Sequence, residues 1–206
     1  MSDSVRMHLP NRESVVGVVL AGGASSRMGR DKAFVEVAGR TMLAWVARAL
    51  GSVAGTVVVA GKTGDLGGLV GVPDAGRPHL GPLAGVAAAS AAHPESILLA
   101  VAVDQPWVRA ATLEGLLSAG GHLPVVPVDG GVRQSTCAAY PPDLGDLLTE
   151  ELEAAGSLQS LLDRTAFEAI TDDVWRAWGE DGRSWFGVDR PERISEGLGR
   201  FGSPAA

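Results

Sequence analysis

Short runs of apolar residues alternate along the chain with stretches in which apolar residues recur at helical spacing. The runs that predict buried strands are Val15 to Leu20, Thr56 to Ala60, Ile97 to Val103, Pro124 to Val128 and Thr136 to Tyr140. Strands and helices that alternate in this way form parallel sheets with right-handed crossovers and helices on both faces. The pattern therefore predicts an α/β fold, a three-layer α/β/α sandwich.

Helical spacing marks the stretches between these runs. The predicted helices are Met42 to Leu50 with Thr41 as N-cap, a segment that opens at Gly81-Pro82, Thr112 to Ala119, and Leu144 to Leu162 with a break at Gly156. The segment Gly130 to Tyr140 is expected to add an antiparallel strand to an otherwise parallel sheet.

A chain of 206 residues fits one domain, which on folding hides roughly 70% of the surface that the unfolded chain exposes. We expect a single domain over residues 14–198, an N-terminal tail over residues 1–13 and a frayed tail from Gly199 to Ala206. Glycine clusters between Gly64 and Gly71, which predicts a flexible stretch there.

Composition and charge exclude several classes of protein. Cys137 is the only cysteine, and the segment Met1 to Glu13 is polar instead of carrying the apolar core of a signal peptide, so we expect a reducing, cytoplasmic location. The longest apolar run, Ile97 to Val103, is far below the ~18 residues that span a bilayer. The net charge of -7 argues against a nucleic-acid partner, so any phosphate site must be local.

Three polar clusters follow or precede the predicted strands. They are Ala21 to Lys32 after the first strand, Asp74 to Gly85 before a helix, and Asp104-Gln105-Pro106 after the central strand. Ligands of such sheets bind beyond the carboxyl ends of the strands. We therefore expect the three clusters to converge on one pocket.

The first cluster has the composition of an anion-binding loop. Residues Leu20 to Lys32 read LAGGASSRMGRDK. Adjacent glycines let backbone N–H groups approach phosphate oxygens, and Arg27 and Lys32 supply positive charge. A glycine pair alone is more often an ordinary connection, but the whole thirteen-residue pattern favours a phosphate site.

Asp104 stands out because it ends a continuous apolar strand. A carboxylate in that position is costly to bury unless it is paired or bound to a metal ion. The alternative is an aspartate that caps a helix beside Pro106.

These residues resemble a known family. Leu20 to Lys32 is similar to the signature L-x-G-G-x-S-x-R-M-G-x-D-K of the molybdenum cofactor guanylyltransferases, the MobA group of the nucleotidyltransferase superfamily. Gly81 to Gly85 resembles the family's GPLAG loop, Val103 to Pro106 its acidic turn, and Phe186 to Glu192 its closing F-x-N-x-N-T-P-E element. The motifs keep the family's order over about residues 15–195. The resemblance implies a Rossmann-like, mostly parallel sheet of the nucleotide-diphospho-sugar-transferase type.

The resemblance also implies an activity and two substrates. A member of this family transfers GMP from GTP to molybdopterin with Mg²⁺ as cofactor and releases pyrophosphate. Leu20, Ala21 and Gly22 would then meet guanine and ribose through backbone atoms. Gly23, together with Arg27 and Lys32 as catalytic residues, would handle the phosphates.

Further roles follow from the other motifs. Asp74 resembles the family carboxylate that contacts the nucleotide, the alternative being a turn-forming aspartate after Pro73. Asp104, also expected to be catalytic, resembles the residue that binds Mg²⁺ beside the nucleotide, with Asp189 as its partner. Gly81 and Gln134 would contact the acceptor.

The sequence departs from the family pattern at three places. Asp189 stands where the family usually has Asn, which would make the metal site more acidic. Ala60-Gly61-Lys62 lacks a common Asn, which weakens the prediction of base selectivity. Ser135 replaces a common Pro next to Gln134, so the acceptor pocket could differ.

Two other functions are open to such a sequence. One is a related transferase that uses CTP or another phosphorylated acceptor, such as a molybdopterin cytidylyltransferase, although the second glycine of Gly22-Gly23 favours guanine. The other is a degenerate regulatory protein that only binds nucleotide, against which the presence of Lys32 and Asp104 speaks. We expect a monomer or small homo-oligomer that contacts other molybdenum cofactor enzymes only transiently.

Overall fold

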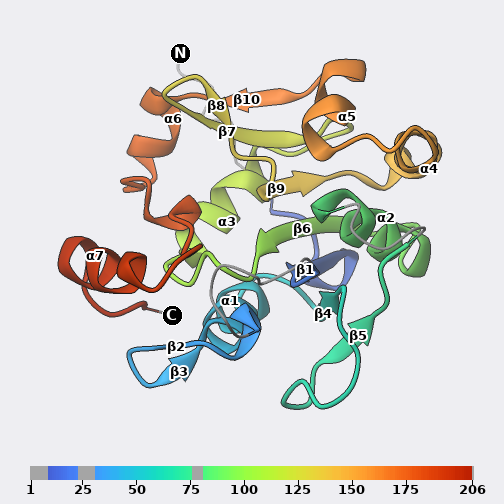
Figure 1. Ribbon diagram of the computed structural model, residues 1–206. Helices are drawn as coiled ribbons and strands as arrows, with labels where there is room; N and C mark the ends of the chain where they lie inside the picture. The colour runs from blue at the N-terminus through green and yellow to red at the C-terminus, as the bar shows by residue number, and fades with distance from the viewer. Residues whose placement is uncertain (1–8, 23–30, 76–80, 206) are drawn as a thin grey trace.

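A computed structural model describes residues 9–22, 31–75 and 81–205. Its centre is an eight-stranded sheet, and a separate two-stranded hairpin lies beside it (Figure 1). The strands of the large sheet are β1 (Val15–Leu20), β4 (Thr56–Ala60), β5 (Val70–Val72), β6 (Ile97–Ala102), β7 (Val125–Asp129), β8 (Val132–Arg133), β9 (Cys137–Tyr140) and β10 (Glu168–Ile170). The hairpin pairs β2 (Glu36–Val37) with β3 (Arg40–Thr41).

The strands follow the order β10-β7-β9-β6-β1-β4-β5, and β8 pairs with β7. The segment β6-β1-β4-β5 is parallel throughout, whereas β9 runs antiparallel to both β6 and β7. The predicted antiparallel addition is thus confirmed. Because β9 is reversed, its first residue lies at the edge of the sheet where β6 ends.

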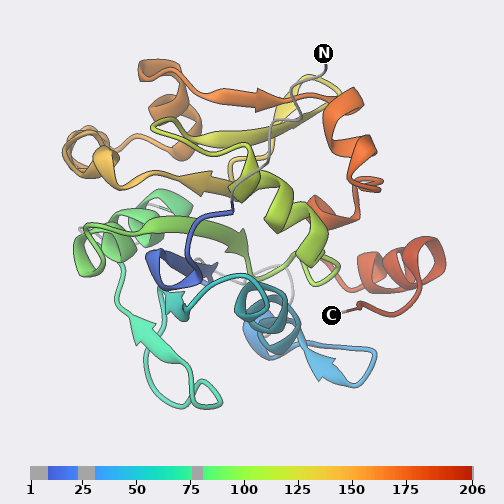
Figure 2. The same ribbon diagram turned by 180° about the vertical axis from the view of Figure 1, so that it is seen from behind.

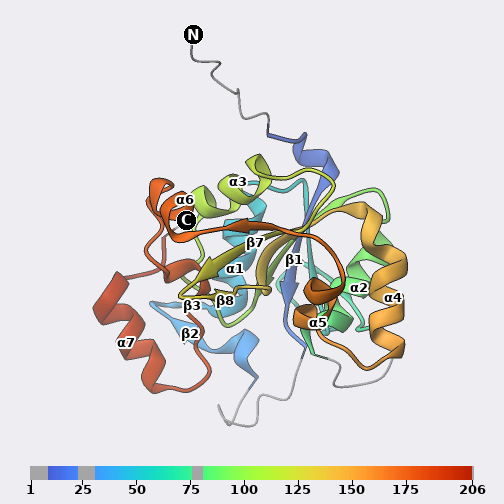
Figure 3. The same ribbon diagram turned by 90° about the horizontal axis from the view of Figure 1, so that it is seen from above.

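Seven α-helices are described: α1 (Met42–Gly51), α2 (Pro82–Ala92), α3 (Ala110–Ser118), α4 (Gly145–Glu153), α5 (Leu158–Arg164), α6 (Asp172–Ala177) and α7 (Glu192–Phe201). Viewed from above, α1 and α3 lie on one side of the sheet and α2, α4 and α5 on the other (Figure 3). The predicted three-layer sandwich is confirmed. Figure 2 shows the α1 and α3 face directly.

The alternation of side chains along β1 explains why both faces are covered. Val15 and Val19 belong to the apolar cluster under α1 and α3, while Val16 and Val18 belong to the cluster under α2 and α4. A strand buried on both faces reads as an unbroken apolar run, as in the sequence of β1.

Close packing of α1 and α2 depends on small residues. Gly17 faces α1, where an added Cβ would lie 2.8 Å from the Cβ of Leu50. Gly85 of α2 faces β1, where an added Cβ would lie 2.9 Å from a terminal carbon of Leu20. The side-chain hydroxyl of Thr41 accepts from the backbone N–H of Ala44 and so caps α1, as predicted.

Several elements were not predicted from the sequence. They are β5, which begins at the end of the stretch expected to be flexible, the β2-β3 hairpin, β10, α6 and α7. Each strand among them has only two or three residues, too few to show a period. Strands β5 and β10 are also defined by partners distant in sequence, β4 and β7.

The predicted frayed C-terminal tail is wrong at its start. Helix α7 continues through Phe201, and the indole N–H of Trp107 donates to the carbonyl of Gly202 at 2.8 Å. Phe201 and Ile194 pack against a third apolar cluster that contains Trp107, Phe186 and Val188. These contacts hold the end of the chain against the domain.

The expected N-terminal tail also makes contacts at its end. Arg12 belongs to a short 3-10 helix, and its guanidinium donates to the carbonyls of Gly51, the last residue of α1, and of Ala54 beyond it. Residues 1–8 of that tail lie outside the described part of the chain. Within the described residues, none of the helices has the length and apolar character that crossing a membrane requires.

Candidate active site

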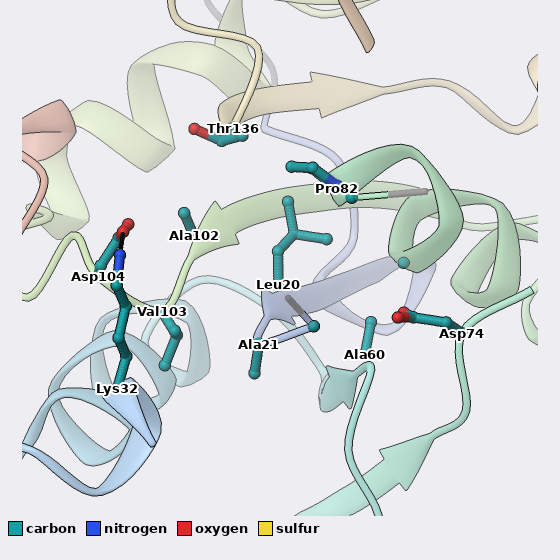
Figure 4. Close-up of a pocket in the computed structure, with 13 residues that line it drawn as sticks. Leu20, Ala21, Lys32, Ala60, Asp74, Pro82, Ala102, Val103, Asp104 and Thr136 are labelled. Atoms are coloured by element: carbon teal, nitrogen blue, oxygen red, sulfur yellow. Dashed lines mark hydrogen bonds and ion pairs between the residues drawn. The ribbon is translucent and has the colours of Figure 1, made fainter. Parts of the chain in front are cut away.

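A pocket of about 290 Å³ opens at the carboxyl ends of β1, β4 and β6 (Figure 4). The three polar clusters recognised in the sequence meet there, as the rule for parallel sheets predicts. The pocket is lined by Leu20, Ala21, Gly22, Lys32, Ala60, Asp74, Gly81, Pro82, Gly85, Ala102, Val103, Asp104 and Thr136.

Lys32 and Asp104 form an ion pair in this pocket. The Nζ atom of Lys32 lies 2.7 Å from Oδ2 of Asp104, and the two side chains are 22% and 25% exposed. Lys32 is positioned by a short 3-10 helix that Asp31 caps by accepting from the backbone N–H of Ala33. The pair places one cation and one carboxylate where the sequence analysis expected phosphates and a metal ion.

The backbone around Asp104 joins three segments. The N–H of Val103 donates to the carbonyl of Leu20, and the N–H of Val188 donates to the carbonyl of Asp104 at 2.7 Å. An added Cβ at Gly187 would lie 4.0 Å from Oδ1 of Asp104. The segment that carries Asp189 therefore runs next to Asp104, and Asp189 itself is partly exposed.

Asp74 occupies the other end of the pocket (Figure 4). Its Oδ1 atom is buried and accepts no hydrogen bond from the described residues. Burial raises the pKa of the Asp74 carboxyl above its ordinary value, and the positive charge of Lys62 opposes part of that rise. A buried carboxylate oxygen without a hydrogen-bond donor is costly.

Two glycines let the chain pass close to Asp74. Gly61 has φ +82°, and an added Cβ there would lie 2.4 Å from the Cα of Gly22. An added Cβ at Gly22 would lie 2.6 Å from Oδ2 of Asp74. The two loops and the carboxylate are therefore in van der Waals contact, and neither position has room for a side chain.

Lys62, which is not part of the pocket lining, links the loop after β4 to the loop after β1. Its ammonium forms an ion pair with Asp31, the residue that caps the Lys32 helix. Lys32 and Lys62 are the only lysines in the chain, and both lie at this edge of the sheet. Each of the two ammonium groups is paired with an aspartate, Lys32 with Asp104 and Lys62 with Asp31.

Most of the site residues predicted from the sequence lie around the pocket. Those in its lining are Leu20, Ala21, Gly22, Lys32, Asp74, Gly81 and Asp104. Gly23 and Arg27 lie outside the described residues. Gln134 and Asp189 are absent from the lining, and the Gln134 amide donates instead to the carbonyl of Val132.

Sequence reasoning missed the polar lining residue Thr136. Its hydroxyl accepts a hydrogen bond from Gln105 at 3.3 Å. Thr136 comes directly before β9, and only the reversed direction of that strand brings it to the pocket edge. The available signal was that Thr136 begins the predicted strand Thr136 to Tyr140, within the segment that was expected to run antiparallel.

The described residues contain no group of three or more histidine, cysteine, aspartate or glutamate side chains that could hold a metal ion. Mg²⁺, however, is usually bound by one or two carboxylates together with substrate phosphates and water. The Asp104 carboxylate in the pocket, with the Asp189 segment beside it, fits that mode of binding.

Comparison with known proteins agrees with the fold and with the order of the motifs. The family model described as "MobA-like NTP transferase domain" matches residues 17–170. The chain is 38% identical to a molybdenum cofactor guanylyltransferase of Xanthomonas euvesicatoria over 148 residues, 70% of this chain and 75% of the relative. It is 30% identical to that of Pseudomonas putida over 190 residues, 87% of this chain and 95% of the relative.

Solved structures with the same fold are more distant in sequence. Molybdopterin-guanine dinucleotide biosynthesis protein A of Archaeoglobus fulgidus aligns with a TM-score of 0.72 at 20% identity, covering 89% of this chain and 96% of that one. The 2-C-methyl-D-erythritol 4-phosphate cytidylyltransferase of Thermus thermophilus aligns with a TM-score of 0.64 at 19% identity, covering 89% and 98%. These neighbours confirm the predicted nucleotidyltransferase fold.

Proposed function

The chain belongs to the MobA-like NTP transferase family, and from that premise we propose that it is a molybdenum cofactor guanylyltransferase that transfers GMP from GTP to molybdopterin and releases pyrophosphate. One observation carries the proposal beyond family membership. The orphaned carboxylate of Asp74 and the Lys32–Asp104 ion pair lie at opposite ends of one pocket.

The spacing of these groups suits a nucleotide. Asp74 follows β5, and its carboxylate lies against Gly22 and Gly61 at the ends of β1 and β4, whereas Asp104 follows β6 and pairs with Lys32. A single ligand that meets both groups must extend along the edge of the sheet. The base then lies at Asp74 and the phosphates lie at Lys32, where the positive charge is.

Asp74 supports the choice of guanine. The Watson–Crick edge of guanine presents two adjacent donors, N1–H and the N2 amine, which a carboxylate accepts as a bidentate pair. Cytosine presents a single amine beside the acceptor N3, which would face a carboxylate oxygen unfavourably. A site with a buried unpaired acceptor discriminates strongly against a ligand that leaves it unpaired.

The chemistry requires positioning and charge neutralisation. A phosphate oxygen of molybdopterin attacks the α-phosphorus of GTP in line, the bond to the bridging oxygen breaks, and pyrophosphate leaves. The ammonium of Lys32 stabilises negative charge that builds up on the departing group. The acceptor's phosphate monoester is already largely ionised at neutral pH, so no general base is needed.

Asp104 and Asp189 are the carboxylates that would hold Mg²⁺. When bound, the ion would neutralise phosphate charge and polarise the phosphoryl oxygens. Lys32 contacts Oδ2 of Asp104 and so keeps this carboxylate at the phosphate end of the pocket. The sequence also predicts a cytoplasmic location for the protein, a monomer or small homo-oligomer, and only transient contact with other molybdenum cofactor enzymes. These three statements stay predictions.

A pyrophosphate-release assay tests the proposal. Purified protein is incubated with Mg²⁺, molybdopterin and either GTP or CTP, and controls omit the acceptor or the metal ion. We expect release with GTP that depends on both molybdopterin and Mg²⁺, and much less with CTP. Release with CTP in preference to GTP would contradict the choice of base, and no release with either nucleotide would contradict the transferase activity.

A further inference from the structure

The buried side chain of Gln105 is hydrogen-bonded to Thr136, which lines the pocket at the end remote from Asp74. The side-chain oxygen of Gln105 accepts from the backbone N–H of Ala102 at 3.3 Å, and its amide nitrogen donates to the hydroxyl of Thr136 at 3.3 Å. Gln105 is 5% exposed, so its amide has little access to water. Thr136 lines the pocket.

The backbone N–H of Ala102 donates to the carbonyl of Thr136 at 2.8 Å and also to the side-chain oxygen of Gln105 at 3.3 Å, and the second contact sets the orientation of the Gln105 amide. A backbone N–H can only donate, so the group of Gln105 that faces Ala102 must be the oxygen, and the nitrogen must face Thr136. An amide nitrogen can only donate, so the Thr136 oxygen must accept. The single hydroxyl hydrogen of Thr136 is then left to donate to another group.

That hydrogen has no acceptor among the interactions of the described residues, while the Thr136 side chain lies at the pocket surface. Figure 4 draws its oxygen on the side of Asp104 and away from Pro82. A preset donor beside a cation and a carboxylate in a phosphate-binding pocket matches the oxygen of a phosphoryl group.

The strand order shows which phosphoryl group this is. Thr136 precedes β9, and in the order β9-β6-β1-β4-β5 this strand lies beyond β6 from the side of Asp74. A nucleotide that places its base at Asp74 and its phosphates at Lys32 and Asp104 extends toward Thr136 but does not need to pass β6. The space next to β9 is where a second substrate can approach the α-phosphorus.

We infer that the hydroxyl of Thr136 binds the phosphate monoester of the acceptor, and that Gln105 is a positioning residue that sets this hydroxyl as a donor. The inference rests on the proposed guanylyl transfer and adds a subsite to it. Of the two residues that the sequence assigned to the acceptor, Gly81 lies in the pocket lining and Gln134 does not. Thr136 therefore has the acceptor-binding role that was expected of Gln134.

The first test is the substitution Thr136→Val, which keeps the side-chain shape and removes the donor. We expect the KM for molybdopterin to rise by about 10- to 100-fold, as for the loss of a hydrogen bond to a charged group. The KM for GTP should stay within about twofold. Thr136→Ser should keep the wild-type KM for molybdopterin, and Thr56→Val, an exposed threonine at the opposite end of β4, serves as the matched control.

The second test asks whether Gln105 acts through Thr136. In Gln105→Glu the carboxylate can only accept, so Thr136 turns its hydrogen toward residue 105 and loses its donor to the ligand. We expect Gln105→Glu to raise the KM for molybdopterin in the wild-type background and to have no further effect in the Thr136→Val background. Equal effects in the two backgrounds would show simple charge repulsion and would overturn the positioning role.

The outcomes separate this inference from the proposed function. Wild-type protein that releases no pyrophosphate from GTP and molybdopterin would contradict the proposed function and, with it, the subsite. Active wild-type protein with an unchanged KM for molybdopterin in Thr136→Val, or with a raised KM for GTP instead, would overturn the subsite alone. Equilibrium titration with molybdopterin in the absence of GTP should show the same loss of affinity in Thr136→Val.

Discussion

At the scale of single residues, Asp74 and Asp104 lie in the same pocket but differ in their partners. The Oδ1 atom of Asp74 is buried without a hydrogen-bond donor among the described residues, and burial raises the pKa of its carboxyl. Unsatisfied buried groups of this kind cluster at functional sites, where a ligand supplies the missing partner. Asp104, by contrast, is already paired with Lys32 before any ligand binds.

The raised pKa of Asp74 predicts how stability changes with pH. The folded protein binds the Asp74 proton more tightly than the unfolded chain does, so this group makes stability fall as pH rises from the ordinary value of 3.8 to the raised one. Asp74→Asn removes this loss. We expect a higher melting temperature than wild type at neutral pH and a difference that shrinks as pH falls toward 3.8.

Thermal melts across this pH range, without nucleotide, test the prediction. The substitution Asp65→Asn, at an aspartate whose side chain accepts from the N–H of Gly67 in an exposed loop, is the control, and its difference from wild type should not follow the same course. A melting temperature of Asp74→Asn below that of wild type at neutral pH would contradict the account of Asp74 as a costly buried acceptor.

Asp104 is expected to be essential for turnover but not for folding. The substitution Asp104→Asn keeps the shape of the side chain and removes the charge that faces Lys32 and the expected metal ion. We expect kcat to fall by at least about 100-fold, the effect of losing one electrostatic contact to the transition state. Circular dichroism should be unchanged, and Asp143→Asn at an exposed aspartate should keep full activity.

At the scale of elements, the turn that follows β4 holds the loop that follows β1. The N–H of Ala21 donates to the carbonyl of Ala60, and Gly61 packs directly against Gly22. Neither loop could approach the other if it carried a side chain at these positions. The shape of the pocket at Ala21, Gly22 and Ala60 therefore depends on contact between two turns that are far apart in sequence.

This contact predicts different results for two glycines of the same segment. Both Gly61 and Gly64 have positive φ, but an added Cβ at Gly61 would lie 2.4 Å from Gly22, whereas none of the described atoms lies within 4 Å of one at Gly64. Alanine strains the backbone at either position. We expect kcat/KM for GTP to fall by about 10- to 100-fold in Gly61→Ala alone, since the Gly22 loop must move.

Steady-state kinetics of the two variants, at matched folded fractions, check this prediction. Equal kcat/KM values in Gly61→Ala and Gly64→Ala would mean that contact with Gly22 does not control the site.

At the scale of the whole molecule, the segment before the C-terminal helix runs beside Asp104, and the helix itself packs on the domain. Helix α7 follows Asp189 and packs on Trp107, whose indole N–H donates to Gly202. Trp107 in turn lies a few residues after Asp104. The packing of α7 on Trp107 thus links the end of the chain to the two segments that carry Asp104 and Asp189, the carboxylates expected to bind the metal ion.

Two glycines of α7 provide a matched test of the packing between α7 and Trp107. An added Cβ at Gly197 would lie 2.3 Å from the ring of Trp107, whereas at Gly199 none of the described atoms lies within 4 Å. Gly197→Leu should lower the free energy of unfolding by about 1–3 kcal/mol through overpacking. Gly199→Leu should be neutral or raise it by up to about 1 kcal/mol through helix propensity.

Chemical denaturation measures both values. If α7 were only loosely attached, the two substitutions would have the same effect on stability, and the activity of Gly197→Leu would match that of wild type.

The sequence by itself determined the features that depend on neighbouring residues. Apolar runs predict β1, β4 and β6, and Thr41 predicts the start of α1. The motifs place Lys32 and Asp104 after strands and Asp74 before a helix. These features follow from local periodicity and capping, which act over a few residues. The rule that strand ends of a parallel sheet share one edge extends them to a common pocket.

Only the tertiary structure decided how these residues meet. Lys32 and Asp104 are 72 positions apart, and their separation of 2.7 Å depends on the order of strands and the path of the loops between them. The same holds for the unpaired oxygen of Asp74, the Gln105–Thr136 pair and the seat of α7 on Trp107. Contacts of this kind depend on packing between segments distant in sequence, which no local pattern records.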